Sequence, residues 1–292
     1  MLLALPLVPI VLALASPLAP GPTAVPALEP GSASLPVLSV NIIDGSDDRG
    51  SLLDLGPGLG LSPAEIARIR QVSGYVGCFL PSPSIGTGAL FLTNRQVLTA
   101  AHIFFEPTGG KRSHCFFKSQ APGAKRIDLA VEAGEARFGA AHPKAGSNND
   151  YAIVRLVTPV AGAEPFPVDP TPVKPGDRLI VVSAHPADME REVDNAIPVV
   201  QPCTVRRVPK STGATSFYRT DCDATGASSG GMHLARVGTR LVYRGITITT
   251  GPWRDAGLQG AAYDEKQGSV TTALGTDAAI LAAGKSLASG EP

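Results

Sequence analysis

The segment VLTAAH, residues 97–102, places a histidine directly after a short run of β-forming residues. Similar runs, rich in β-branched and aromatic residues and separated by turn residues, recur along most of the chain. They lie at 75–80, 88–92, 97–100, 136–139, 151–156, 179–183, 199–208, 216–220, 231–234, 241–249 and 268–272. With 32 glycines and 27 prolines in 292 residues, this rhythm predicts an all-β fold.

A proline-rich segment, residues 159–176, divides these runs into two groups. It holds six prolines and cannot be a central strand, because proline has no amide hydrogen to give to the strand ladder. We therefore predict two β-barrels, at about 74–158 and about 177–275, with residues 159–176 as the connector between them.

Two helices are predicted outside the β-type runs. The sequence SPAE, residues 62–65, combines an N-cap, a proline at the first helical position and a glutamate that can reach back to the cap. This start predicts a short helix that ends at about residue 70. A second helix is predicted at 276–288, where a Thr-Asp cap precedes an alanine-rich face that would pack on a barrel.

The N-terminal segment is almost wholly apolar from residue 2 to residue 14, although it lacks a positively charged start. The sequence ALA at 13–15 offers a small-x-small cleavage site, so we predict a signal peptide at 1–15 and no stable membrane insertion after cleavage. A membrane anchor is the alternative, and it is disfavoured because four prolines interrupt the first 20 residues. Residues 16–73 are interpreted as a pro-segment or N-terminal extension.

The charge of the chain is balanced, with 25 Lys and Arg against 25 Asp and Glu. Such a chain generates no positive field to attract a phosphate backbone, so we expect no nucleic-acid partner. The five histidines and four cysteines show no His-x-x-x-His or Cys-x-x-Cys spacing, so we predict no metal and no cofactor. The oligomeric state is left open by the sequence.

Three short patterns carry residues of catalytic chemistry. They are His102 at the end of VLTAAH, Asp150 before the β-type run in NNDYAIVRL (148–156), and Ser229 in the glycine-flanked turn GASSGG (226–231). Each pattern alone is weak, because lone histidines, Asn-Asp turns and Ser-Gly-Gly loops are common. In the order His, Asp, Ser along a two-part all-β chain, they fit a known arrangement of the hydrolytic triad.

The sequence resembles the chymotrypsin-fold, trypsin-like serine endopeptidases, whose signatures are Thr-Ala-Ala-His, Asn-Asp-x-Ala-x-x-x-Leu and Gly-x-Ser-Gly-Gly. The resemblance covers 74–292, which is therefore interpreted as the peptidase domain. The segments GSDDR, 45–49, and TDCD, 220–223, are similar to the secreted bacterial branch that includes the glutamyl endopeptidases. The family implies two six-stranded antiparallel β-barrels with a short C-terminal helix, and an active site in the crevice between the barrels.

The resemblance implies a secreted or periplasmic serine endopeptidase that hydrolyses protein or peptide substrates through an acyl-enzyme intermediate. Ser229 would be the nucleophile, His102 the general base and acid, and Asp150 the residue that holds the imidazole tautomer. A catalytically silent binding or regulatory protein with the same fold is the alternative. An esterase of the α/β-hydrolase type is disfavoured, because strand-helix alternation is absent.

The backbone amides of Ala227 and Ser229 would form the oxyanion hole. Ala227 stands where the family has glycine, and a Cβ there would cost about 1 kcal/mol if the backbone needs a positive φ. An alternative register makes Ser228 the nucleophile, but we favour Ser229 because two glycines directly follow it.

The trypsin mechanism of activation is not expected. In that mechanism a new N-terminus pairs with an aspartate directly before the nucleophile, and here the uncharged Ser228 holds that position. Chains trimmed at different points between residues 36 and 50 are therefore expected to have similar activity.

Two residues are predicted to contact the substrate side chain. In this family the pocket floor lies six residues before the nucleophile, at Asp223, and the wall is the following strand, which contains Thr247. A carboxylate at the floor would select Arg or Lys. The alternatives are a structural Asp223 that binds backbone amides, a preference for small residues, and the acidic selectivity of the glutamyl enzymes. Their wall strand usually carries a histidine, which residues 245–249 lack.

The four cysteines permit three disulfide pairings. Cys78 and Cys115 flank the histidine region of the first barrel, whereas Cys203 and Cys222 flank a hairpin-like pair of runs in the second. We therefore predict Cys78–Cys115 and Cys203–Cys222, which suit an oxidising compartment. Ile103 stands where the animal enzymes have the cysteine of their histidine loop, so that bridge is absent.

Overall fold

The computed structural model describes residues 40–132, 134–185, 195–210, 216–251 and 260–290. The predicted signal peptide, residues 1–15, and the first part of the predicted extension, residues 16–39, lie outside these ranges. The described residues belong to one compact unit, Leu38–Pro292.

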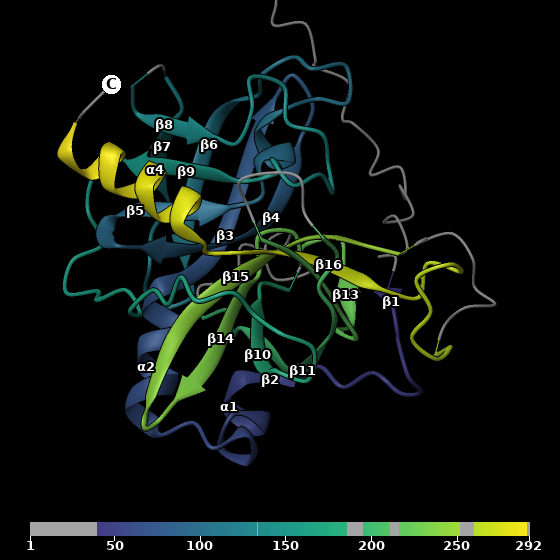
Figure 1. Ribbon diagram of the computed structural model, residues 1–292. Helices are drawn as coiled ribbons and strands as arrows, with labels where there is room; N and C mark the ends of the chain where they lie inside the picture. Colours follow the sequence, from purple (N-terminus) through teal and green to yellow (C-terminus); the bar gives the residue numbers. More distant parts are fainter. Residues whose placement is uncertain (1–39, 133, 186–194, 211–215, 252–259, 291–292) are drawn as a thin grey trace, which may run out of the picture. The chain divides into compact units, whose positions relative to one another are not determined.

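The first barrel is an antiparallel sheet of six strands in the order β5-β4-β3-β6-β7-β9, closed by the pairing of β5 with β9 (Figure 1). A further short strand, β8, pairs with β9 along the same edge of β9 as β7. The strands are β3 (Ser73–Leu80), β4 (Ser84–Phe91), β5 (Thr93–Thr99), β6 (Ser113–Ser119), β7 (Ile127–Ala130), β8 (Ala136–Phe138) and β9 (Ala152–Leu156).

The second barrel has six strands in the order β10-β14-β15-β16-β12-β11, and the pairing of β10 with β11 closes it. Its strands are β10 (Arg178–Ser183), β11 (Val199–Arg207), β12 (Phe217–Thr220), β14 (Met232–Val237), β15 (Arg240–Thr250) and β16 (Thr271–Gly275). The proline-rich segment 159–176 connects the barrels. The predicted fold of two six-stranded antiparallel barrels is therefore confirmed.

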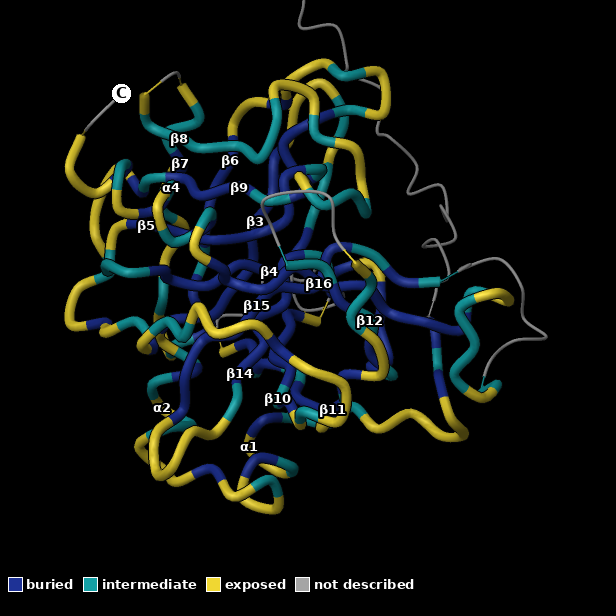
Figure 2. Tube along the Cα trace, in the orientation of Figure 1, coloured by how far each residue is buried: buried dark blue, intermediate teal, exposed yellow. Residues whose placement is uncertain are grey.

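One continuous cluster of buried side chains joins the two barrels. It includes Phe91 and Leu98 from the first barrel and Met232 and Ile246 from the second, all with no exposed area. Figure 2 shows the strands largely buried and the connecting turns largely exposed. Truncating one buried side chain of this size costs about 2–5 kcal/mol, so the packing of this shared core strongly favours one arrangement of the two barrels. That arrangement sets the walls of the crevice between them.

The two predicted helices form as their caps indicate. Helix α2 (Pro63–Val72) starts with a capping box, in which Ser62 accepts the Glu65 amide and the Glu65 carboxylate accepts the Ser62 amide. Helix α4 (Ala278–Ser289) is capped by Asp277, whose carboxylate accepts two amides of the first turn. Figure 1 shows α4 lying on the first barrel, where it contacts β5, β8 and β9.

Residues 40–73, interpreted from the sequence as part of an N-terminal extension, belong to the same compact unit as the rest of the described chain. Strand β1 (Val40–Asn41) pairs with β13 (Ala224–Thr225), and β2 (Gly50–Ser51) pairs with β11. The remaining elements here are α1 (Leu52–Leu55) and the 3₁₀ helix η1 (Pro57–Leu59). Trimming the chain to residue 50 would remove β1 and its pairing with β13, so the expectation that trimmed chains behave alike does not fit this packing.

Both predicted disulfides are present. Cys78–Cys115 joins β3 to β6, and Cys203–Cys222 joins β11 to the segment before β13. Closing loops of 37 and 19 residues stabilises the fold by about 3–4 kcal/mol each in the chain-entropy account.

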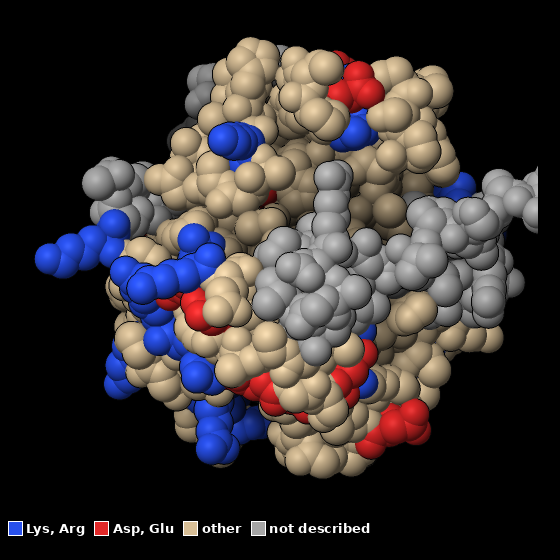
Figure 3. Space-filling model, turned by 90° about the vertical axis from the view of Figure 1, so that its right-hand side faces the viewer, with Lys and Arg blue, Asp and Glu red and all other residues tan. Residues whose placement is uncertain are grey.

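The surface carries charges of both signs. On the face shown in Figure 3, Lys and Arg side chains and Asp and Glu side chains both occur, and most of the visible surface is uncharged. This distribution agrees with the balanced composition of the chain. No helix in the described part of the chain has the length and hydropathy of a membrane span.

Candidate active site

His102 and Asp150 meet because the strands that precede or follow them are paired. β5 leads into the 3₁₀ helix η2 (Ala101–Phe104), which carries His102, and Asp150 lies just before β9, the partner of β5. Asp150 Oδ1 accepts the backbone amide of His102 at 2.9 Å, and Oδ2 lies 2.8 Å from His102 Nδ1. This two-point contact places the proton of a neutral imidazole on Nδ1, which leaves Nε2 as the basic nitrogen.

The carboxylate of Asp150 is held in turn by its surroundings. Its side chain has no exposed area, and Oδ2 also accepts the amide of Gly146 at 2.7 Å. Three donors, the amides of His102 and Gly146 and the Nδ1–H of His102, therefore hold this carboxylate in one orientation.

Ser229 lies in the turn after β13, against the segment that carries His102. Its carbonyl oxygen accepts the amide of Thr87 at 2.7 Å. Gly86 packs between Ser229 and Ile103, the residue that follows His102. A Cβ on Gly86 would lie 2.4 Å from Ile103 Cδ1 and 2.7 Å from the Ser229 carbonyl oxygen. The structure thus brings the three predicted triad residues from both barrels to one crevice. In the described ranges Ser229 Oγ makes no hydrogen bond, so the hydroxyl is not committed to another group.

Gly230 is required directly after Ser229. Its φ is +81°, which favours glycine, and a Cβ there would lie 1.9 Å from the Thr87 carbonyl oxygen and 2.3 Å from Thr99 Oγ1. This close approach explains why the Ser-Gly pattern is needed at the junction of the two barrels.

Ser228 has a different environment from Ser229. It is 4% exposed, and its Oγ accepts the backbone amide of Thr225 at 2.9 Å. Ser229 is half-buried instead. Of the two adjacent serines, Ser228 is therefore bonded within its own turn, whereas the hydroxyl of Ser229 makes no hydrogen bond to a described residue.

The turn before Ser229 contains Ala227 without backbone strain. The amide of Ser228 donates to the Thr225 carbonyl at 3.0 Å, and among the described residues other than glycine only Asp44, Leu92 and His114 have a positive φ. Ala227 therefore does not have a positive φ, and its Cβ does not carry the cost of about 1 kcal/mol that a positive φ would impose. The amides of Ala227 and Ser229 have no hydrogen-bond acceptor within the described part of the chain.

Asp223 faces the N-terminal segment of the chain. Its two carboxylate oxygens accept the backbone amides of Ile43 at 2.8 Å and Asp48 at 2.7 Å, and it is 2% exposed. Its own backbone amide and carbonyl bind the side chain of Gln201. These contacts favour the structural interpretation of Asp223 over a role at the floor of a substrate pocket.

The burial of Asp223 makes a testable contribution to stability. Burial raises its pKa to about 6 from the ordinary 3.8, although the two amide hydrogen bonds act in the opposite direction. Between these values the native state holds a proton that the unfolded chain has released. The free energy of unfolding therefore falls as the pH rises from 4 to 7, by about 2 kcal/mol from this group.

Urea unfolding of the wild type and Asp223→Asn at several pH values measures this contribution. The stability difference, wild type minus variant, is expected to decrease from pH 4 to pH 7. Asp54→Asn, in the exposed part of α1, serves as the control for loss of a surface carboxylate. A difference that stays constant or increases with pH contradicts the assignment.

Thr247 lies at the end of a buried chain of hydrogen bonds that the sequence did not predict. Its Oγ1 is 2.8 Å from His233 Nε2, and His233 Nδ1 is 2.8 Å from the Tyr218 hydroxyl. Burial lowers the pKa of His233 to about 3, so this imidazole is neutral at ordinary pH. The wall strand has no histidine of its own, but the pairing of β14 with β15 places His233 directly beside it.

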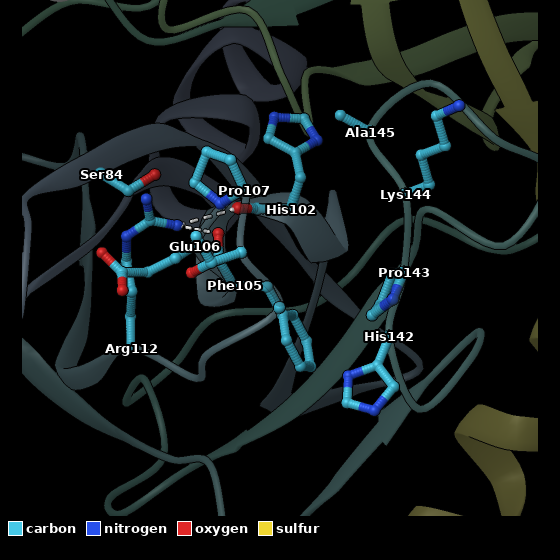
Figure 4. A pocket seen from close by; sticks show the side chains of 12 residues that line it. Ser84, His102, Phe105, Glu106, Pro107, Arg112, His142, Pro143, Lys144 and Ala145 are labelled. Carbon is cyan, nitrogen blue, oxygen red and sulfur yellow. Dashed lines mark hydrogen bonds between the residues drawn. The ribbon is translucent and has the colours of Figure 1, made fainter.

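A cavity of about 760 Å³ lies beside His102 on the side of the first barrel (Figure 4). Its lining includes Phe105, Glu106, Arg112 and His142. Within the ranges that the structure describes, no cluster of three or more His, Cys, Asp or Glu is arranged to hold a metal ion.

Comparisons with known proteins identify the family to which a chain with this fold and site belongs. The model of the trypsin-like peptidase domain family matches residues 86–241, more than half of the chain. The chain therefore belongs to the trypsin-like peptidase domain family. A search of curated protein sequences found no match.

Solved structures share the fold at low sequence identity. A Glu endopeptidase is 14% identical, with a TM-score of 0.57 over 83% of this chain and 97% of its own. The thermostable serine protease AL20 from an extremophilic microorganism is 13% identical, with a TM-score of 0.53 over 76% of this chain and 99% of its own. Protease Anisep from Arthrobacter nicotinovorans is 13% identical, with a TM-score of 0.51 over 75% and 96%.

Proposed function

We propose that this trypsin-like protein is a serine endopeptidase whose triad is Ser229, His102 and Asp150. The observation that carries the proposal is the double attachment of His102 to the buried Asp150, at 2.9 and 2.8 Å. The hydroxyl of Ser229, which bonds to no other described group, is free to act as the nucleophile. A serine hydroxyl becomes a strong nucleophile only when a base takes its proton, and Nε2 of His102 is the base in this arrangement.

The reaction proceeds in two stages. Ser229 Oγ attacks the peptide carbonyl and gives its proton to His102 Nε2, which then passes that proton to the departing amine as the C–N bond breaks. Water attacks the resulting acyl-enzyme ester, with His102 again taking and returning one proton. The amides of Ala227 and Ser229 stabilise the oxyanion of each tetrahedral intermediate, a role that their lack of another acceptor supports.

The site of action proposed for this enzyme is outside the cytoplasm, in the periplasm or the extracellular medium. Two disulfides support this, because such bonds persist in oxidising compartments. Its substrates are proteins or peptides. The contacts of Asp223 with the N-terminal segment give no support to selectivity for Arg or Lys.

A fluorophosphonate probe tests the proposal directly, since it labels only a serine activated by a base. Treatment of the purified full-length protein, followed by peptide mapping, is expected to place the label on Ser229. Ser229→Ala is expected to abolish labelling, and Ser228→Ala to retain it. A folded protein that takes no label would be the catalytically silent alternative.

A further inference from the structure

Arg112 makes an unusual set of contacts with the backbone that carries His102. It directly precedes β6, and it is 9% exposed. Its Nη1 donates to the carbonyl oxygens of His102 at 3.2 Å, Ile103 at 3.5 Å and Phe105. Figure 4 shows the guanidinium beside the backbone of His102, with the imidazole ring directed away from it.

Two of these carbonyls, those of Ile103 and Phe105, accept no backbone amide in the described part of the chain, whereas the His102 carbonyl also accepts the Phe105 amide at 3.4 Å. A short helix such as η2 leaves the carbonyls of its last turn without partners inside the helix, and a buried carbonyl without a partner is costly. A guanidinium offers five donors in a rigid plane and stays charged at all ordinary pH values. One buried arginine can therefore complete the hydrogen bonding of the whole turn.

The guanidinium and Asp150 hold opposite sides of the same residue. The backbone amide of His102 donates to Asp150, and its backbone carbonyl accepts from Arg112. The two peptide groups that flank His102 are thus each fixed by a charged, buried side chain. This restricts how the imidazole can move relative to Ser229.

Arg112 is itself well anchored. Its Nε donates to the carbonyl of Ser82 at 3.0 Å, and its backbone amide donates to Phe104 at 2.8 Å. Three residues later, Cys115 joins β6 to β3 through the disulfide with Cys78. Neither disulfide of the chain includes a residue of η2, so no covalent bond holds the turn of His102 directly.

We propose that Arg112 is a positioning residue that fixes the turn of His102 and keeps Nε2 directed toward Ser229. The inference rests on the proposed function, because it needs His102 to act as the base. A displacement of about 1 Å in a catalytic group can cost about 100-fold in rate. Loss of Arg112 therefore lowers kcat through His102, while substrate binding elsewhere in the crevice is retained.

The test uses Arg112→Met, which keeps most of the side-chain volume and removes the donors. Peptide hydrolysis is expected to lose about 100-fold in kcat with less than a threefold change in KM. Arg112→Lys keeps the charge with a single ammonium and is expected to lose about tenfold, which provides a second variant if Arg112→Met does not fold. Wild-type kcat in either folded variant overturns the proposal.

A matched control and a double variant separate positioning from general damage. Arg68 also donates to two backbone carbonyls, those of Glu164 and Pro165, but in the connector. Arg68→Met is expected to keep wild-type kcat.

Adding Arg112→Met to His102→Ala is expected to cause no further loss of kcat, because Arg112 acts through His102. A further 100-fold loss in that background would indicate general damage and overturn the proposal. Full activity of His102→Ala itself would reject the proposed function instead.

Discussion

Ser229→Ala is expected to lower kcat for peptide hydrolysis by about 10⁶-fold while the fold stays intact. The hydroxyl is the attacking group of the proposed mechanism, and no other group at this position can form the acyl-enzyme. His102→Ala is expected to have an effect of the same order, and the double variant to lose little more, because the triad acts as one unit. Steady-state kinetics with a peptide substrate, beside circular dichroism of each variant, measure these effects.

Ser228→Ala is the matched control for this prediction. Its hydroxyl accepts the Thr225 amide inside the turn, so the substitution is expected to cost about 1 kcal/mol of stability and less than tenfold in kcat. The reverse result, with activity lost in Ser228→Ala and kept in Ser229→Ala, would move the nucleophile to Ser228.

Asp150→Asn is expected to lower kcat/KM by about 10⁴-fold. The carboxylate accepts from both the backbone amide and Nδ1 of His102, whereas an asparagine side chain has only one oxygen to accept with. Its amide group would donate to Nδ1, and the proton of the imidazole would then move to Nε2. In that tautomer Nε2 cannot take the proton of Ser229.

The measurement is kcat/KM at a pH where the wild-type rate is maximal. Asp177→Asn provides the control, because Asp177 also accepts a backbone amide, from Lys174, but lies at the connector. A loss of less than tenfold in Asp150→Asn would remove this residue from the triad.

The parts of the fold that could be predicted from the sequence are those determined by residues close together in the chain. The capping box at residues 62–65 and the cap at Asp277 are contained within a few neighbouring residues, so the helices could be located from sequence alone. The strand runs that alternate with turns were located in the same way. His102, Asp150 and Ser229 could be proposed as the triad because each stands in a short pattern of its own.

The parts that the sequence did not predict depend on distant partners. Strand β7 (Ile127–Ala130) has only four residues, one of them charged, and it exists because β6 and β9 pair with it. β6 was also missed, although it contains Cys115. The contact of Thr247 with His233 arises from the register of two strands. Arg112 has no local signal, because an arginine before a strand is common and its three carbonyl partners are known only from the folded chain.

The pairing of β1 with β13 has a consequence for the order in which the parts of this molecule fold during synthesis. It joins the start of the described chain to the residues just before Ser229, and the nearby contact from Ile43 to Asp223 spans 180 positions. During synthesis the N-terminal strand leaves the ribosome long before its partner has been translated. Contacts of such sequence separation form late, because closing a long loop costs entropy before any contact compensates for it. The turn that holds Ser229 therefore acquires this support only after residues 224 and 225 have been made, when about three quarters of the chain is present. A shorter, unfinished chain lacks this support and with it the assembled site proposed above.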